Sequence, residues 1–156
     1  MIKEQQDISL HQVYLGLGSN LGDREATISR AIALIDERVG RVLRRSSLIE
    51  TDPWGFASVH RFLNGVILCE TGLPPREVLK ATQAIERELG KRHKHATVRY
   101  QTSNLKPQAS NFKDRPIDID ILLYDDLTVD EPDLKIPHPL MQEREFVMKP
   151  LAEIKD

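Results

Sequence analysis

The segment Pro116–Tyr124 is the feature that most constrains the fold of this chain. Three isoleucines alternate there with Asp118 and Asp120, and a period of two is typical of a β-strand with one buried and one polar face. Because side chains two positions apart share a face, the two carboxylates are expected about 6 to 7 Å apart. The strand therefore predicts either a site for one or two hard cations such as Mg²⁺ or an ordinary solvated face.

Further strands and two amphipathic helices are predicted before this segment. Strands are expected at 11–18, 42–49 and 62–70, and helices at 23–38 and 75–89. The resulting order, β-α-β-β-α-β, is that of a ferredoxin-like sandwich, an α+β fold with an antiparallel sheet and both helices packed on one face. The proline-rich end of the chain is expected to finish in a short helix.

Length and composition indicate one globular domain over 1–156, with 1–10 as a flexible N-terminal extension. No apolar run approaches the roughly 20 residues of a membrane helix, and the polar start of the chain lacks the apolar stretch of a secretory signal. The single cysteine, Cys69, lies in an apolar run and excludes an internal disulfide. These features favour a cytoplasmic protein with no membrane contact, and nothing in the sequence requires more than a monomer.

The net charge of −2 conceals a reversal of sign along the chain. Residues 91–115 carry seven Lys or Arg side chains and one acid, whereas residues 118–133 carry seven acids and no base. The stretch 91–114 lacks periodicity and is predicted as a long loop, a kind of segment that is often a functional lid. A uniformly basic nucleic-acid binder does not show this pattern. The reversal favours a site where phosphates meet a divalent cation, with two solvated segments of opposite charge as the alternative.

Other candidate site residues lie in turns and strands. Arg115 precedes Asp118 by three residues, where its guanidinium suits phosphate oxygens or simply offsets the acids. The stretch Gly16–Gly22 is interpreted as a tight strand-to-helix turn, because it matches neither a Rossmann fingerprint nor a Walker A loop. His138, in a turn, is either structural or a donor to phosphate. Asn64 lies within an apolar strand, where a buried amide needs partners and could read the edge of a heterocycle.

Together these pieces resemble the 6-hydroxymethyl-7,8-dihydropterin pyrophosphokinase family of folate biosynthesis, over nearly the whole chain. The motifs that carry the resemblance occur in the expected order: Leu17–Asp23, Thr51–Gly55, Phe62–Asn64, Thr82–Glu86, Asp114–Leu122, Ile136–His138 and Arg144–Phe146. The Arg-x-x-Asp-x-Asp core that begins at Arg115 is the most specific of them. The chain departs from the family pattern at 91–114, where it has an insertion.

The resemblance implies transfer of a diphosphoryl group from ATP, the co-substrate, to the hydroxymethyl oxygen of a reduced pterin, with AMP as the other product and two Mg²⁺ ions required. The catalytic positions that it implies are Arg115, Lys91, Asp118 and Asp120, the two aspartates also being the metal ligands. The ATP-binding positions are Gln83, Glu86, Arg115, Ile121, His138 and Arg144. The pterin-binding positions are Thr51, Trp54, Phe62, Asn64 and Phe146, of which the three aromatics are otherwise candidate core residues.

Two alternatives to an active pyrophosphokinase stay open from the sequence. A catalytically impaired relative would keep the pterin and ATP sites and lose turnover through the altered loop. An RNA-binding ferredoxin-like module would use the basic residues 91–115, but such modules display aromatics on the open sheet face, where this chain has carboxylates. The expected partners are therefore the small molecules ATP and 6-hydroxymethyl-7,8-dihydropterin, with no nucleic acid.

Overall fold

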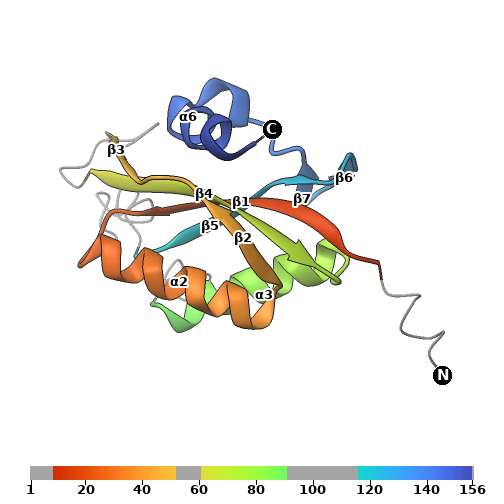
Figure 1. Ribbon diagram of the computed structural model, residues 1–156, viewed down its shortest axis with the longest axis horizontal. Helices are drawn as coiled ribbons and strands as arrows, with labels where there is room; N and C mark the ends of the chain where they lie inside the picture. Colours follow the sequence, from red (N-terminus) through yellow and green to blue (C-terminus); the bar gives the residue numbers. More distant parts are fainter. Residues whose placement is uncertain (1–8, 52–60, 91–115, 156) are drawn as a thin grey trace, which may run out of the picture.

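The computed structural model describes residues 9–51, 61–90 and 116–155. Its main sheet has five strands, which are β1 (His11–Ser19), β2 (Arg41–Arg45), β3 (Ile49–Thr51), β4 (Phe62–Thr71) and β5 (Asp118–Tyr124). All neighbouring strands are antiparallel, and the spatial order is β2-β4-β1-β5 (Figure 1). β3 pairs with β4 as well, so β2 and β3 follow one another along the same side of β4.

Helices cover both faces of this sheet (Figure 1). α2 (Arg24–Arg38) and α3 (Pro75–Glu88) lie on one face, and α6 (Glu145–Ile154) lies on the other. The Asp23 side chain caps α2 by accepting a hydrogen bond from the Ala26 N–H, and Pro75 suits the first turn of α3, where an N–H needs no helical partner. β5 and α6 are linked by a hairpin of β6 (Val129–Glu131) and β7 (Leu134–Ile136), and by the 3-10 turn η1 (Met141–Glu143).

This arrangement confirms the ferredoxin-like α+β prediction. The two predicted helices share one face of an antiparallel sheet, and the predicted strands and helices occur in the predicted order. The C-terminal helix, which the sequence predicts without placing it, covers the second face. The result is a sheet with two helices on one side and one on the other.

Alternate residues of the strands feed two separate apolar clusters. The cluster between the sheet and α2 and α3 includes Val13, Leu15, Leu17, Ile67, Cys69, Ile119 and Ile121. The cluster under α6 includes Tyr14, Val66, Leu68, Leu122, Met141, Val147, Leu151 and Ile154. The period of two in each strand therefore decides which helix a residue meets.

The predicted strand 42–49 is two strands, and Ser46 explains the break. The Ser46 N–H donates to the Val66 carbonyl and the Val66 N–H donates to Ser46 Oγ, both at 2.9 Å, so a hydroxyl replaces a backbone acceptor of the ladder. Two residues later, the Leu48 side chain packs against Gly65. A Cβ at Gly65 would lie 2.6 Å from Leu48 Cδ2. The predicted strand at 116–124 begins only at Asp118.

Residues 1–8 of the expected N-terminal extension and the whole predicted loop 91–114 lie outside the described residues. In the part of the chain that is described, no helix has the length and apolar character needed to cross a bilayer.

Candidate active site

Polar side chains gather on the α6 face of the sheet, toward the end of β1. In the strand register Gly18 pairs with Asn64 on β4 and with Asp118 on β5, and Gly16 pairs with Asp120. Directly opposed residues of antiparallel strands share a face, so the amide and the two carboxylates lie on the same side of the sheet as the two glycines. The predicted pair of carboxylates is thus on one face, with a strip of bare backbone beside it.

The stretch Gly16–Gly22 is the end of a strand followed by a turn, in agreement with the strand predicted at 11–18, and the strand extends one residue further than predicted. Gly16 and Gly18 are both residues of β1, which continues to Ser19, and the turn itself starts at Asn20. Only Gly22, at φ +70°, has the left-handed backbone that favours glycine in the turn. Two glycines spaced by two in a strand share a face, which was the sequence signal for a bare surface.

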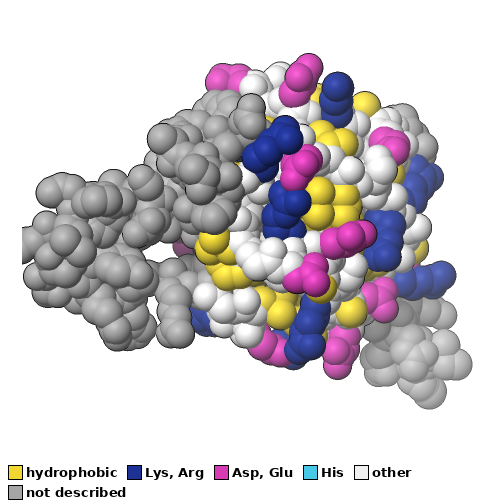
Figure 2. All heavy atoms as spheres, turned by 90° about the vertical axis from the view of Figure 1, so that its left-hand side faces the viewer, with side chains coloured by type: hydrophobic (Ala, Val, Ile, Leu, Met, Phe, Trp, Pro, Cys, Tyr) yellow, Lys and Arg dark blue, Asp and Glu magenta, His cyan; other side chains and the backbone are white. Residues whose placement is uncertain are grey.

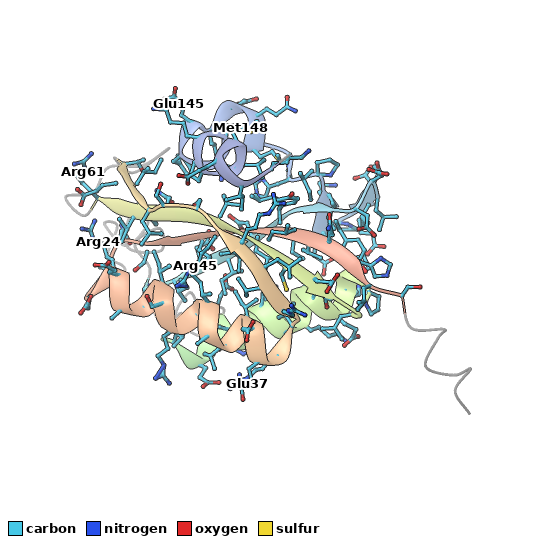
Figure 3. All side chains as sticks on the ribbon, in the orientation of Figure 1. Arg24, Glu37, Arg45, Arg61, Glu145 and Met148 are labelled. Atoms are coloured by element: carbon cyan, nitrogen blue, oxygen red, sulfur yellow. The ribbon has the colours of Figure 1, made fainter. Side chains whose placement is uncertain are left out.

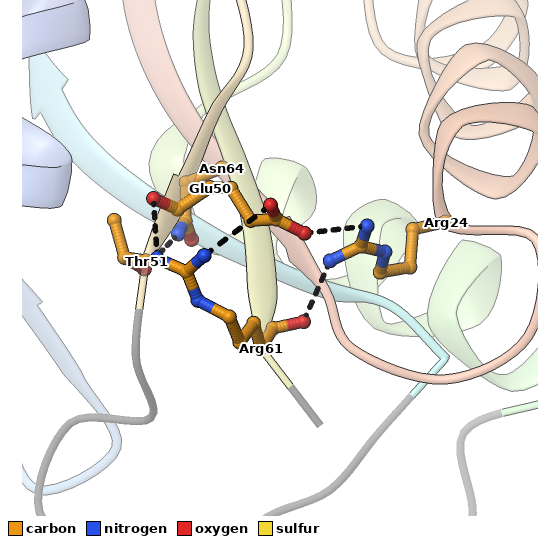
Figure 4. A network of polar contacts seen from close by, with 5 residues as sticks. All are labelled: Arg24, Glu50, Thr51, Arg61 and Asn64. Carbon is orange, nitrogen blue, oxygen red and sulfur yellow. Dashed lines mark hydrogen bonds and ion pairs between the residues drawn. The ribbon is translucent and has the colours of Figure 1, made fainter. Parts of the chain in front are cut away.

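Gly18 leaves room for the side chains on β4. A Cβ at this position would lie 2.9 Å from Asn64 Oδ1 and 3.5 Å from Phe62 Cδ1. Asn64 is buried, and its Nδ2 donates to Thr51 Oγ1 at 2.8 Å, a bond that fixes the orientation of the amide (Figure 4). The structure therefore brings together the predicted pterin residues Thr51, Phe62 and Asn64, with Phe62 and Asn64 next to the buried backbone of Gly18.

His138 approaches the carboxylates from the segment between β7 and η1. Its backbone N–H donates to the Leu122 carbonyl at 3.1 Å, and its Nδ1 accepts from the Leu140 N–H at 3.3 Å. Burial lowers the pKa of His138; Arg144 also lowers this pKa, and Asp118 raises it. The neutral ring with Nδ1 as acceptor carries its proton on Nε2, where it is a hydrogen-bond donor. These electrostatic influences place Asp118, His138 and Arg144 near one another.

The start of α6 contributes the last described candidates. The guanidinium carbon of Arg144 lies 5.6 Å from the centroid of the Phe146 ring, a cation–π distance. Phe146 is half-buried and packs against the cluster under α6. Phe62 is in the sheet and Phe146 is in the helix that covers this face, and their predicted role as two sides of an aromatic sandwich stays a prediction.

Two predicted ATP residues lie on α3, beside the edge strand. Glu86 is 3% exposed, and its Oε2 accepts the Ile119 N–H at 2.7 Å, so the carboxylate holds α3 against β5. Gln83 is half-buried, three residues earlier and on the same side of the helix. The Ile121 side chain is in the cluster under α2 and α3, which leaves its backbone as the part able to meet a nucleotide.

The predicted residues Trp54, Lys91 and Arg115 lie outside the described residues. Sequence reasoning also did not single out Arg24, Glu50 and Arg61, which form a polar network next to Thr51 (Figure 4). Their types are common on surfaces, and only their position in the fold makes them notable.

Asp118 and Asp120 suit a hard cation by their chemistry. Both are half-exposed and provide carboxylate oxygens on one face of the strand. Among the described residues no group of three or more His, Cys, Asp or Glu side chains forms a metal-binding cluster. Mg²⁺ commonly takes one or two protein carboxylates and completes its shell with water and substrate phosphates, so this pair fits Mg²⁺ bound together with a phosphate chain.

The fold is that of a ferredoxin-like domain of the kind found in solved HPPK-DHPS chains. One such chain, crystallised with substrates, has a TM-score of 0.64 and 14% identity, with 94% of this chain and 40% of that chain covered. The wild-type Plasmodium falciparum HPPK-DHPS with SDX-DHP has a TM-score of 0.63 and 16% identity, with 92% of this chain and 40% of that chain covered. The chain thus spans about 40% of the length of these solved proteins, and the likeness concerns the fold.

Sequence comparison defines the family. The family described as 7,8-dihydro-6-hydroxymethylpterin-pyrophosphokinase matches residues 14–156. The 2-amino-4-hydroxy-6-hydroxymethyldihydropteridine pyrophosphokinase of Porphyromonas gingivalis is 48% identical over 143 residues, covering 91% of this chain and 89% of the relative. The enzyme of the same name from Bacillus subtilis is 40% identical over 142 residues, covering 90% and 76%. The chain belongs to the 7,8-dihydro-6-hydroxymethylpterin-pyrophosphokinase family of ATP-dependent diphosphotransferases, which confirms the resemblance.

Proposed function

We propose that this chain transfers diphosphate from ATP to the hydroxymethyl group of 6-hydroxymethyl-7,8-dihydropterin, a step of folate biosynthesis. The hydroxymethyl oxygen forms a bond to the β-phosphorus of ATP, the bond from that phosphorus to the α,β-bridging oxygen breaks, AMP leaves, and the hydroxyl proton is released. The observation that carries the proposal is the position of Gly18 between Asn64 on one strand and Asp118 on the other. An amide suited to a heterocycle and a carboxylate suited to a phosphate-bound cation thereby flank one strip of sheet.

The acceptor half of the site is proposed to bind the pterin ring. With Nδ2 of Asn64 held by Thr51, the amide oxygen keeps a fixed direction and can accept a hydrogen bond from an N–H on the ring edge. Phe62 and Phe146 provide apolar faces for the ring from the sheet and from α6. Trp54 is proposed to add a contact to the same pocket, as the family resemblance implies.

The donor half is proposed to bind ATP. Asp118 and Asp120 would hold the two Mg²⁺ ions that the family resemblance implies, and Mg²⁺ supplies neutralisation of the triphosphate charge when bound. Nε2–H of His138 donates to a phosphate oxygen, and Arg144 adds a fixed positive charge beside it. Arg115 and Lys91 are proposed as further catalytic cations. The remaining proposed nucleotide contacts are Gln83, Glu86 and the backbone of Ile121.

The described residues favour a mechanism based on positioning and electrostatics. The carboxylates near the reacting groups are proposed as metal ligands, and His138 is oriented as a donor, so the chain's contribution is alignment of the two substrates and exclusion of water. The proposed working unit is a cytoplasmic monomer whose partners are ATP and the pterin, rather than nucleic acid or a membrane.

The product of the reaction tests this proposal. Purified protein is incubated with ATP, Mg²⁺ and 6-hydroxymethyl-7,8-dihydropterin, and the nucleotide products are separated by chromatography. We expect AMP and pterin diphosphate in equal amounts, with no AMP when the pterin or Mg²⁺ is omitted. Formation of ADP in place of AMP would overturn the reaction. Binding of both substrates by calorimetry without any turnover would instead identify an impaired relative.

A further inference from the structure

Three charged residues form a network at the end of the sheet that holds the proposed pterin site (Figure 4). Arg24 Nη2 lies 2.7 Å from Glu50 Oε2, and Arg24 Nη1 donates to the Arg61 carbonyl oxygen at 2.9 Å. Arg61 Nη1 lies 3.4 Å from Glu50 Oε1. Viewed from this end, the described surface carries acidic and basic side chains interleaved with small apolar areas (Figure 2). The guanidinium of Arg24 therefore joins α2 to β3 and to Arg61, the residue just before β4.

The residues that Arg24 holds are the immediate neighbours of proposed pterin residues. Glu50 precedes Thr51, Arg61 precedes Phe62, and Thr51 is paired with Phe62 in the strand register. Neighbouring residues of a strand point to opposite faces, so the Glu50 side chain points toward α2 while Thr51 and Phe62 face the pterin side. The Asn64 to Thr51 hydrogen bond depends on the same strand pair.

β3 is a short strand whose other ties are the hydrogen bond from Asn64 to Thr51, the bond from Arg61 to the Glu50 carbonyl oxygen at 3.5 Å, and the contacts of Ser46 and Ser47 before it. It is three residues long, it lies at the edge of the sheet, and it pairs with β4 alone. Short edge strands open at a lower free energy than central strands, because few hydrogen bonds must break. A guanidinium is suited to bridging two acceptors in fixed directions, here a carboxylate on β3 and the carbonyl of the residue that precedes β4.

We infer that Arg24 is a positioning residue of the pterin site, which holds β3 against β4 so that Thr51, Phe62 and Asn64 keep the geometry that receives the ring. This inference rests on the proposed function for its ligand and on the described contacts for its geometry. The hydrogen bond from Arg24 also lowers the pKa of the Glu50 carboxyl group. Figure 3 shows Arg24 and Arg61 at the same end of the sheet, below and above it.

The same helix offers a matched control at its other end. Arg38 Nη1 lies 2.8 Å from Glu88 Oε1, and the two side chains are 39% and 41% exposed, close to the 30% and 43% of Arg24 and Glu50. This pair joins α2 to α3, and no hydrogen bond or ion pair is seen between it and a proposed site residue in the described part of the chain. Exposed ion pairs contribute little to stability, so loss of either pair is expected to affect unfolding equally and slightly.

Steady-state kinetics separate positioning from stability. We expect Arg24→Ala to raise the KM for the pterin roughly fivefold, the upper range for an exposed ion pair, with kcat and the KM for ATP unchanged. Arg24→Lys keeps the charge opposite Glu50 but cannot bridge both acceptors as a fork does, so its KM should fall between those of wild type and Arg24→Ala. Arg38→Ala should match wild type. An unchanged pterin KM in Arg24→Ala, or an equal rise in both KM values, would overturn the inference.

Hydrogen exchange tests the clamp without the reaction. In the substrate-free protein we expect Arg24→Ala to speed exchange of the β3 amides and of Phe62 to Asn64 roughly tenfold, with no change in the amides of β1, and Arg38→Ala to change neither. Equal exchange rates in Arg24→Ala and wild type would show that Arg24 does not hold β3, even if the enzyme is active. If the wild-type protein forms no AMP, the proposed function is contradicted. The exchange result still decides whether Arg24 holds β3.

Discussion

The two faces of the central strands differ in composition although alternate residues of the same segments form them. Toward α2 and α3, Leu15, Leu17 and Ile119 are at most 6% exposed and fill a continuous apolar cluster. Their neighbours on the opposite face include Gly16 and Asp118, which are partly exposed and add no apolar side chain to that cluster. Because one face carries most of the apolar packing around the site, the other face can accept polar residues that would weaken a core.

The α6 face is itself divided. α6 covers the half of the face that bears Tyr14, Val66 and Leu68, and it is fixed at its C-terminal end, where Arg44 Nη1 donates to the Ile154 carbonyl at 2.6 Å. The N-terminal end of α6 reaches the open half and brings Arg144 with it. A packed half thus anchors the helix that contributes to the polar half.

Removing the carboxylates should have the largest effect on function and little effect on folding. We expect Asp118→Asn and Asp120→Asn each to lower kcat/KM by roughly 10³-fold, because a ligand of a charge-neutralising metal is lost. Their urea midpoints should stay near that of wild type, since both side chains are half-exposed and outside the apolar clusters. Asp126→Asn, an exposed acid just beyond the same strand, is the control and should keep full activity. Retention of activity in either variant would contradict the metal-site assignment.

Truncating the residue between those carboxylates should show the reverse pattern. Ile119→Ala removes a side chain that is 6% exposed in the cluster under α2 and α3. We expect a loss of about 2 to 4 kcal/mol in the free energy of unfolding, measured by urea denaturation, with kcat per folded molecule close to wild type. A large loss of turnover with little loss of stability would show that the two faces are not functionally separate.

Much of this architecture is predictable from sequence because each long element has a clear period. The alternation around Asp118 predicts both the strand and the shared face of the carboxylates, and the helices ending near Arg38 and Glu88 follow from apolar spacing. Short elements are different. β3, β6 and β7 have three residues each, too few for a period to be recognised, and the end of β2 depends on a hydroxyl, that of Ser46, replacing a ladder acceptor.

The sequence predicts those parts of the site that depend on local spacing, but not those that depend on strand order. Local spacing places Asp118 beside Asp120, but only the strand order brings Asn64 and Asp118 to opposite sides of Gly18. The clamp by Arg24 depends on a contact between residues 24, 50 and 61, which no local pattern encodes. The roles of Trp54, Lys91 and Arg115 stay predictions, because these residues lie outside the described part of the chain.

Adding one methyl group on the α6 face of β1 tests whether the ring binds beside Asn64. Gly18→Ala places a Cβ 2.9 Å from Asn64 Oδ1, so the amide must move, and we expect the KM for the pterin to rise roughly tenfold. Gly16→Ala, on the same strand and face, meets only the Leu122 side chain at 3.4 Å and should change this KM far less. Calorimetric titration with the pterin gives an independent measure. Equal effects of the two variants would show that the surface beside Asn64 is not where the ring binds.

The smallest expected effect concerns Cys69, on the packed face. Burial raises the pKa of this thiol to about 12, with smaller contributions from Asp36 and Glu70. The unfolded chain ionises near a pKa of about 8.5, so above that pH the unfolded state binds fewer protons than the folded state and stability falls. Between pH 8 and 9.5 we expect wild type to lose about 1 kcal/mol more than Cys69→Ala, measured from urea midpoints, because only wild type has this thiol. Identical pH slopes for the two proteins would mean that Cys69 ionises as readily folded as unfolded, and that this face admits water.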